Sequence, residues 1–212
     1  MNISIKGRYR RGASIALLAL LAAALASCPA GAQTFGQFTT AGVAADGEGG
    51  FFMTAGDDEM NAGVMARFRI TSKSDLGFQG GLESFHDVNA LGIGADFKYY
   101  LLSGETTLPV DLAAGASLGE IFSDDYGRTI LGFSLIASGR LLADTSIPLE
   151  PYGSAGFYTA FFHDGSFSGD SSDSDVVLRG GLNLDLRDDL QFMLEVKIDG
   201  TTTFGAALNL IF

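Results

Sequence analysis

The sequence has few of the residues that build disulfide-linked or metal-centred folds. Cys28 is the only cysteine among 212 residues, so neither a disulfide framework nor a cysteine-based metal site is available within the chain. Proline occurs at four positions, and none of them falls inside an alternating run of apolar and polar residues. Continuous hydrogen-bonded strands require this absence, because proline has no amide hydrogen to donate.

Basic residues are scarce as well. Four of the 13 Lys and Arg residues lie near the N-terminus, at Lys6, Arg8, Arg10 and Arg11, so residues 33–212 carry nine basic and 25 acidic side chains, a formal charge of −16. A chain of that sign repels phosphate backbones, which argues against nucleic acid as a partner.

Residues 1–32 have the features of a secretory signal peptide, which is removed from the mature protein. The basic residues precede an apolar stretch at 13–26, and Ala30-Gly31-Ala32 has the small-residue spacing of a cleavage site. The stretch is shorter than the ~20 apolar residues that cross a bilayer as a helix. Leu25-Ala26-Ser27-Cys28 also fits a lipoprotein lipobox, so lipidation at Cys28 and cleavage after Ala32 are alternatives. Either way, we expect an exported chain.

After residue 33 there is no run of 18 apolar residues and no 3.6-residue period, and what recurs is a period of two. That period is typical of strands with one apolar face. In 176–187, the even positions are leucine, valine or glycine, whereas the odd positions include Arg179, Asn183 and Asp185. Asp188-Asp189 then separates this run from a second one at 190–199, which predicts a tight hairpin.

Alternating runs of this kind predict nine strands, which cover 62–71, 76–86, 91–102, 110–121, 130–142, 151–162, 176–187, 190–199 and 203–212. A closed single-chain barrel has an even number of strands, so one more must come from 49–57 or 35–46. The shorter connection to residue 62 favours 49–57. We therefore expect an all-β fold, a closed antiparallel up-and-down transmembrane β-barrel of ten strands in residues 49–212, with eight strands as the alternative. Residues 33–48 form an N-terminal segment or part of the first strand.

The polar faces of these strands predict an interior lined by ions of both signs. Long charged side chains alternate there with Gly, Ala, Ser and Asn, which suits a narrow lumen where ions pair beside small neighbours. The expected lumen residues are Arg67, Arg69, Glu83, Asp96, Lys98, Asp111, Arg140, Arg179, Asp185, Glu195 and Lys197.

Aromatic residues gather near the ends of the expected strands, where membrane proteins carry interfacial girdles. The girdle residues predicted in this way are Phe85, Tyr99, Tyr100, Phe122, Tyr152, Phe161, Phe162, Phe204 and Phe212.

The final run places an apolar residue at every second position and stops on an aromatic one, at Phe204, Ala206, Leu208, Leu210 and Phe212. This ending resembles the C-terminal insertion signal that assembly machinery reads in bacterial outer-membrane β-barrels, with Phe204, Leu208, Leu210 and Phe212 as its residues. Together with the export segment and the alternating segments of ~10 residues, it makes 49–212 resemble the small OmpA/OmpX-like outer-membrane barrels. One departure is visible: the family's signal often has a glycine where Ala207 stands, and here the glycine is Gly205.

The resemblance implies an outer-membrane location with Phe212 on the periplasmic side. Counting back from it predicts periplasmic turns at 188–189, 143–150, 103–109 and 72–75, and outer loops at 200–202, 163–175, 122–129 and 87–90. The expected partners are outer-membrane lipid and the barrel assembly machinery, and the chain is expected to act as a monomer without a cofactor.

Two Phe-His-Asp triplets contain both histidines and fall at the outer rim of this topology. His86, Asp87, His163 and Asp164 are therefore the candidates for catalysis, because a His–Asp dyad can act as a general base. This arrangement resembles those of two kinds of outer-membrane barrel enzyme, the omptin proteases and the lipid A deacylases. The resemblance implies a second acidic group, for which the candidates are Asp57, Asp58, Asp124 and Asp125. However, aspartate is common in turns, and we expect no enzyme.

The acidic residues of the longest outer loop offer hard oxygen ligands for a divalent cation, but they lack the ordered spacing of an EF-hand, so we expect no metal site. These residues are Asp164, Asp170, Asp173 and Asp175.

The function predicted from these patterns is that of an integral outer-membrane barrel with a polar, largely plugged lumen and a structural, adhesive or protective role. Small barrels have interiors just wide enough for side chains. The alternatives are a narrow porin-like channel for small solutes, an outer-membrane hydrolase with a His/Asp rim site, and a soluble secreted or lipid-anchored β-protein.

Overall fold

The computed structural model describes residues 38–56, 59–85, 88–103, 110–123, 126–141, 147–164 and 171–212. Within them, no helix is long and apolar enough to cross a membrane. The regular structure of these residues consists of ten strands: β1 (Gly47–Gly56), β2 (Glu59–Thr71), β3 (Ser74–Phe85), β4 (Val88–Leu102), β5 (Asp111–Phe122), β6 (Tyr126–Ser138), β7 (Leu149–Asp164), β8 (Ser171–Arg187), β9 (Leu190–Ile198) and β10 (Thr202–Ile211).

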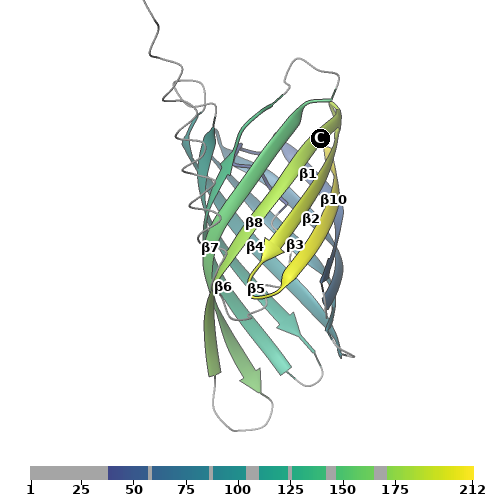
Figure 1. Ribbon diagram of the computed structural model, residues 1–212, viewed down its shortest axis with the longest axis vertical. Helices are drawn as coiled ribbons and strands as arrows, with labels where there is room; N and C mark the ends of the chain where they lie inside the picture. The colour runs from purple at the N-terminus through teal and green to yellow at the C-terminus, as the bar shows by residue number, and fades with distance from the viewer. Residues whose placement is uncertain are drawn as a thin grey trace, which may run out of the picture.

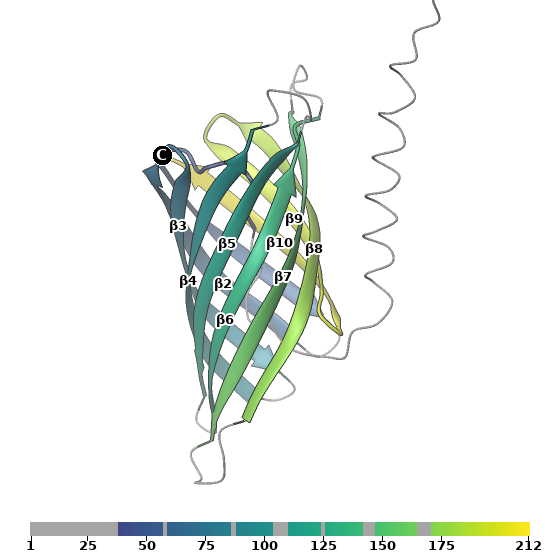
Figure 2. The same cartoon turned by 90° about the vertical axis from the view of Figure 1, so that its left-hand side faces the viewer.

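The strands form one closed antiparallel barrel in which each strand pairs with its neighbours in sequence and β1 pairs with β10 (Figures 1 and 2). The seam is continuous from Glu48↔Ile211 to Gly56↔Thr203. Beyond it, Gly47 and Phe212 exchange two backbone hydrogen bonds of 3.0 and 2.9 Å. The predicted ten-stranded up-and-down barrel is confirmed, and its first strand comes from the 49–57 run rather than from 35–46.

The barrel has two rims. The terminal rim is the end at which Gly47 and Phe212 lie, and it also carries the connections 72–73, 103–110, 139–148 and 188–189. The far rim carries the connections 57–58, 86–87, 123–125, 165–170 and 199–201. The connections fall into the same two groups as the periplasmic turns and outer loops expected from the sequence.

The longest outer loop was predicted too long. β7 continues to Asp164 and β8 already begins at Ser171, so most of the 163–175 segment is strand. The pairs Phe162↔Ser171 and Tyr158↔Asp175 show why: backbone hydrogen bonds extend the ladder through polar residues that carry no apolar alternation. In Figure 1 these two strands reach lower than their neighbours.

The side chains alternate between an outer and an inner face. In β10, Phe204, Leu208 and Leu210 are 63%, 43% and 51% exposed, whereas Thr203 and Asn209 between them are buried. The aromatic residues do not all follow the predicted girdle, because Tyr152 is buried and its hydroxyl donates a 3.1 Å hydrogen bond to Glu195 inside the barrel. An inward position gives the hydroxyl of this tyrosine a carboxylate partner.

Gly181, on β8, makes room for the Tyr152 ring. A Cβ at Gly181 would collide with that ring and with the Leu194 carbonyl oxygen, whereas a Cβ at the outward-facing Gly180 would meet nothing within 4 Å. We expect Gly181→Ala to lower the free energy of unfolding by about 1–3 kcal/mol through overpacking. Gly180→Ala is the matched control and should be close to neutral. Urea titration scored by the mobility of unboiled protein on SDS gels measures both, and equal stability of the two variants would contradict the prediction.

Candidate functional site

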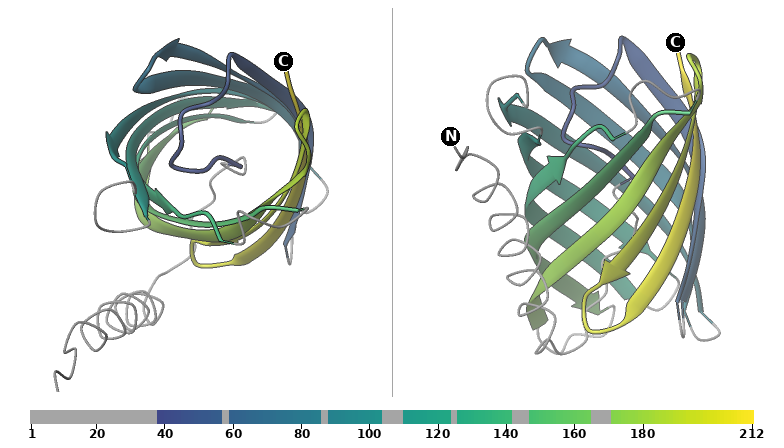
Figure 3. Two further views of the ribbon diagram at one scale, coloured as in Figure 1. Left: turned by 90° about the horizontal axis from the view of Figure 1, so that it is seen from above. Right: turned by 45° about the horizontal axis from the view of Figure 1, so that its top comes forward.

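The interior of the barrel contains a piece of the chain itself. Residues 38–45, here called the inner segment, precede β1 and have no regular structure. Viewed along the barrel, they lie within the ring of strands (Figure 3). Phe38, Ala41 and Ala44 are all buried, at 3%, 0% and 3% exposed. The sequence predicted a lumen filled by side chains and did not reveal this segment.

Backbone amides of the inner segment are bonded to the barrel wall at three widely separated strands. The Phe38 amide donates to Glu195 Oε2 on β9 at 3.3 Å, and the Ala44 amide to Asp75 Oδ2 on β3 at 3.0 Å. Between them, the Ala41 amide donates to Ser138 Oγ on β6 at 3.1 Å. The segment therefore crosses the lumen rather than following one wall.

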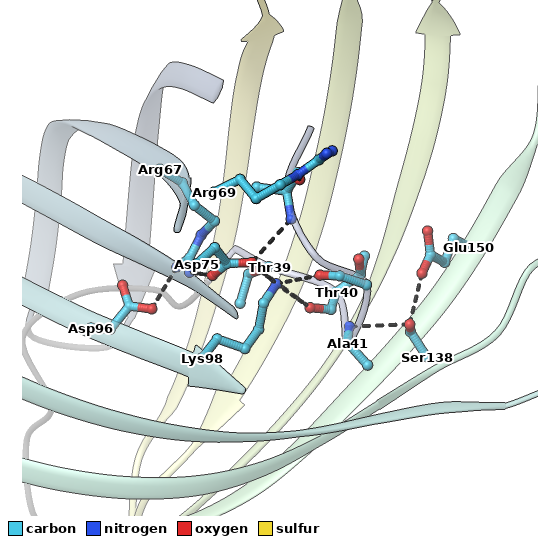
Figure 4. A network of polar contacts seen from close by, with 12 residues as sticks. Thr39, Thr40, Ala41, Arg67, Arg69, Asp75, Asp96, Lys98, Ser138 and Glu150 are labelled. Carbon is cyan, nitrogen blue, oxygen red and sulfur yellow. Dashed lines mark hydrogen bonds and ion pairs between the residues drawn. The ribbon is translucent and has the colours of Figure 1, made fainter. Parts of the chain in front are cut away.

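Lys98, on β4, holds the same segment by its oxygen atoms (Figure 4). Its ammonium donates to Thr39 Oγ1 at 2.8 Å, to the Thr40 carbonyl at 2.9 Å and to the Gly42 carbonyl. It also lies 3.2 Å from Asp75 Oδ2. Lys98 is only 2% exposed, and an ion buried this deeply is tolerated because its donors are all used.

Asp75 is the centre of this cluster. It is 0% exposed and accepts hydrogen bonds from Arg67 and the Ala44 amide while facing Lys98. Arg67 also donates to Asp96 Oδ1 at 2.6 Å. Two cations and two carboxylates thus form one cluster in which each charge has an opposite partner, and Asp75 and Lys98 bond it to the inner segment.

Phe38 anchors the inner segment by apolar contact. Its ring centroid lies 5.8 Å from that of Phe52, within a cluster that includes Tyr152, Met193 and Ala207. Its φ of 34° lies in the left-handed region, which costs a non-glycine residue about 1–3 kcal/mol and persists where the surroundings impose it. A Cβ at Gly205 would lie 2.6 Å from Phe38 Cζ. The displaced glycine of the terminal strand therefore leaves space for this ring.

Nearer the far rim, the interior contains side chains from the barrel wall. Ion pairs join Arg128 to Glu83 at 3.4 Å, Arg179 to Glu195 at 3.5 Å, and Lys197 to Glu59 and Asp199 at 3.1 and 3.2 Å. An apolar cluster packs beside them, formed by Ala90, Ile121, Ile130, Tyr158, Ala160 and Val177. The interior therefore combines ion pairs with an apolar core, whereas the sequence indicated polar residues alone.

The expected lumen residues fall into two sets. Arg67, Glu83, Asp96, Lys98, Arg179, Glu195 and Lys197 belong to the ion-pair clusters. The others lie nearer the terminal rim: Asp111 accepts from the Tyr100 hydroxyl, Asp185 from two side-chain amides, Arg69 lies 3.6 Å from Asp46, and Arg140 is exposed. Sequence reasoning missed Glu59, Asp75, Arg128 and Asp199, which it had placed in turns, at strand ends or outside the lumen set.

The catalytic candidates are only partly within the described residues. His163 faces outward, and its Nε2 lies 3.0 Å from Thr129 Oγ1, which donates a 2.5 Å hydrogen bond to Glu120. The carboxylate therefore binds the hydroxyl and does not orient the imidazole, unlike the acid of a catalytic triad. His86 and Asp87, like Asp57, Asp58, Asp124 and Asp125, lie outside the described residues, as does the side chain of Asp164.

No metal site is formed by the described residues, among which no group of three His, Cys, Asp or Glu side chains is placed to hold an ion. Asp170 and the N-terminal residues 1–37, with the expected signal peptide and Cys28, lie outside the described ranges. The residues of the expected insertion signal all face outward: Phe204, Leu208, Leu210 and Phe212.

Comparison with known proteins assigns the chain to no family. No family model and no curated protein matches it. Among solved structures, it is similar to a bacterial polysaccharide outer membrane secretin at 12% identity and a TM-score of 0.47, covering 73% of this chain and 57% of that one. It is also similar to the β domain of the Bordetella autotransporter Brka (12% identity, 78% and 98% covered, TM-score 0.46). A third similar structure is the N-terminal β-barrel domain of Pseudomonas aeruginosa OprF, at 15% identity and a TM-score of 0.40, covering 78% of this chain and 96% of that one.

Proposed function

We propose that the chain is an integral outer-membrane β-barrel whose lumen is closed, with a structural or protective role in the envelope. The observation that carries this proposal is the distribution of polarity. Each of the ten strands exposes at least one large apolar side chain on the outer face, while Arg67, Lys98, Glu83 and Lys197 are buried inside. A soluble protein would leave that outer face in contact with water.

The closed ladder suits a bilayer for a second reason. Hydrocarbon offers no hydrogen-bond partners, so a sheet can cross it only when every strand edge is paired, as the β1–β10 seam ensures here. The apolar stretch and cleavage pattern in residues 1–32 predict the export that such a location requires. Outer-membrane lipid and the barrel assembly machinery are the partners this proposal implies, with the terminal residues up to Phe212 as the insertion signal.

Two independent features support a closed lumen. The inner segment crosses the half of the barrel nearer the terminal rim, bonded to β3, β4, β6 and β9. The ion pairs and the apolar cluster around Tyr158 lie in the interior nearer the far rim. A solute would have to displace both to cross, which favours a structural role over a channel.

Planar-bilayer recordings test the proposal. The purified mature chain should insert into lipid without producing stable single-channel openings, because the inner segment and the Tyr158 cluster close the lumen in series. Retention in vesicles after alkaline carbonate washing verifies insertion, and a porin added to the same bilayers verifies detection.

Two outcomes would contradict this proposal differently. Stable openings from the inserted chain would indicate a narrow channel and refute the closed lumen. Release of the chain by carbonate would refute membrane insertion itself and favour a soluble β-protein.

A further inference from the structure

A cavity of about 580 Å³ lies beside the inner segment, on the side of the terminal rim. Its wall includes Thr39 and Thr40 of the inner segment, Glu150 from β7, Asn183 and Asp185 from β8, and Gln191 from β9. The volume falls in the range of about 300–1,000 Å³ that ligand pockets occupy.

The carboxylates of this cavity differ from those deeper in the barrel. Glu59, Glu83 and Glu195 each have an ion-pair partner. By contrast, Glu150 accepts from the Ser138 hydroxyl at 2.7 Å, and Asp185 Oδ1 accepts from the amides of Asn183 and Gln191 at 3.3 and 3.0 Å. Within the described residues, neither carboxylate has a cation within ion-pair distance.

The cations that line the cavity are mostly engaged elsewhere. Lys98 is bound to Asp75 and the inner segment, Arg69 donates to the Ala44 carbonyl at 3.0 Å, and Arg187 lies 3.2 Å from Asp189. The remaining one, Arg140, is exposed. The wall formed by β7 and β8 therefore carries two carboxylates, Glu150 and Asp185, for which the described part of the chain provides no ion pair.

Asn183 shows which hydrogen-bonding group is missing. It is 2% exposed, and its Nδ2 donates to Asp185. Because an ionised carboxylate only accepts hydrogen bonds, this contact fixes the orientation of the amide. Its Oδ1 is buried and accepts no hydrogen bond from the described residues. An acceptor left in this state calls for a partner with N–H or O–H groups.

We propose that this cavity binds a small organic cation with ammonium groups, which enters from the terminal rim and lies between Glu150 and Asp185. Lys98 provides the precedent within the same barrel, because its ammonium is held by a carboxylate, a hydroxyl and carbonyl oxygens. The cavity offers a free ammonium the same kinds of acceptor, in Glu150, Asp185, Asn183 and the threonines of the inner segment.

Titration calorimetry of the full mature chain in detergent micelles at low salt tests the proposal. The probe is putrescine, and succinate is its counterpart with the same number of carbon atoms and opposite charge. Putrescine should bind with a Kd of about 1 mM or tighter, and succinate should not bind. The double variant Glu150→Gln/Asp185→Asn should weaken putrescine at least about tenfold, the usual loss for charged hydrogen bonds.

Asp189→Asn is the matched control, because Asp189 is an acidic residue of the neighbouring turn that pairs with Arg187 and does not line the cavity. It should leave the affinity for putrescine unchanged. Absence of putrescine binding, equal binding of succinate, or equal affinity in the double variant would each overturn the proposal. Unboiled SDS gels verify folding, and the two single variants replace the double variant if it does not fold.

Discussion

Asp75→Ala is expected to lower the free energy of unfolding by about 3–5 kcal/mol, the usual cost of removing one partner from a buried ion pair. Asp75 is fully buried and is the carboxylate shared by Arg67, Lys98 and the Ala44 amide. Its loss leaves the Lys98 ammonium with neutral oxygen partners and releases one end of the inner segment. Urea titration in phospholipid vesicles, scored by the mobility of unboiled protein on SDS gels, measures the effect without a tryptophan, which this chain lacks.

Asp46→Ala is the control for that substitution. Asp46 belongs to the same region and pairs with Arg69 at 3.6 Å, but its side chain is 93% exposed. An exposed pair contributes less than about 1 kcal/mol, so the Asp46 variant should be nearly as stable as the parent. If both substitutions lowered the free energy of unfolding by the same small amount, the idea that the buried cluster holds the inner segment in place would be contradicted.

Phe133→Arg is expected to lower the free energy of unfolding in vesicles by about 2–4 kcal/mol, the cost of an arginine on the lipid face near the bilayer midplane. Phe133 lies in the middle of the outer apolar run of β6, between Leu131 and Leu135, and is 68% exposed. In water, the same change at so exposed a position would alter stability by no more than about 0.5 kcal/mol. The experiment therefore separates a lipid-facing barrel from a soluble one.

Phe133→Leu accompanies this variant and should be nearly neutral, because it keeps the position apolar. The proposal of membrane insertion would be refuted if arginine and leucine at this position gave the same stability in vesicles.

The barrel itself could be predicted from the sequence because its signal is local. A period of two marks each strand, and short polar connections between the runs, such as Asp188-Asp189, separate neighbouring strands. The confirmed number of strands followed from the requirement of an even count. The strand ends were less accurate, as at Ser171–Asp175, because backbone pairing continues where the side chains no longer alternate.

The inner segment could not be predicted in the same way. Residues 35–46 carry enough alternation to be a candidate for the first strand. The position of the inner segment, however, depends on residues far along the chain, such as Asp75 for Ala44 and Glu195 for Phe38. Asp75 itself was assigned to a turn on the basis of its neighbours. Gly205, the glycine displaced from its usual place, is a local feature connected with this segment, because the Phe38 ring packs directly against it.

The β1–β10 seam also has a consequence for how the chain folds. It pairs residues from opposite ends of the sequence, such as Glu48 with Ile211, so its loop-closure entropy is the largest of any strand pair in the barrel. Until the seam forms, β1 and β10 each present an unpaired edge, which is a template for aggregation. The other nine hairpin-like pairings are local and form at lower entropic cost. We therefore expect zipping of this seam to be the slow, last step of folding, and the stage at which the unfinished barrel most needs protection from other chains.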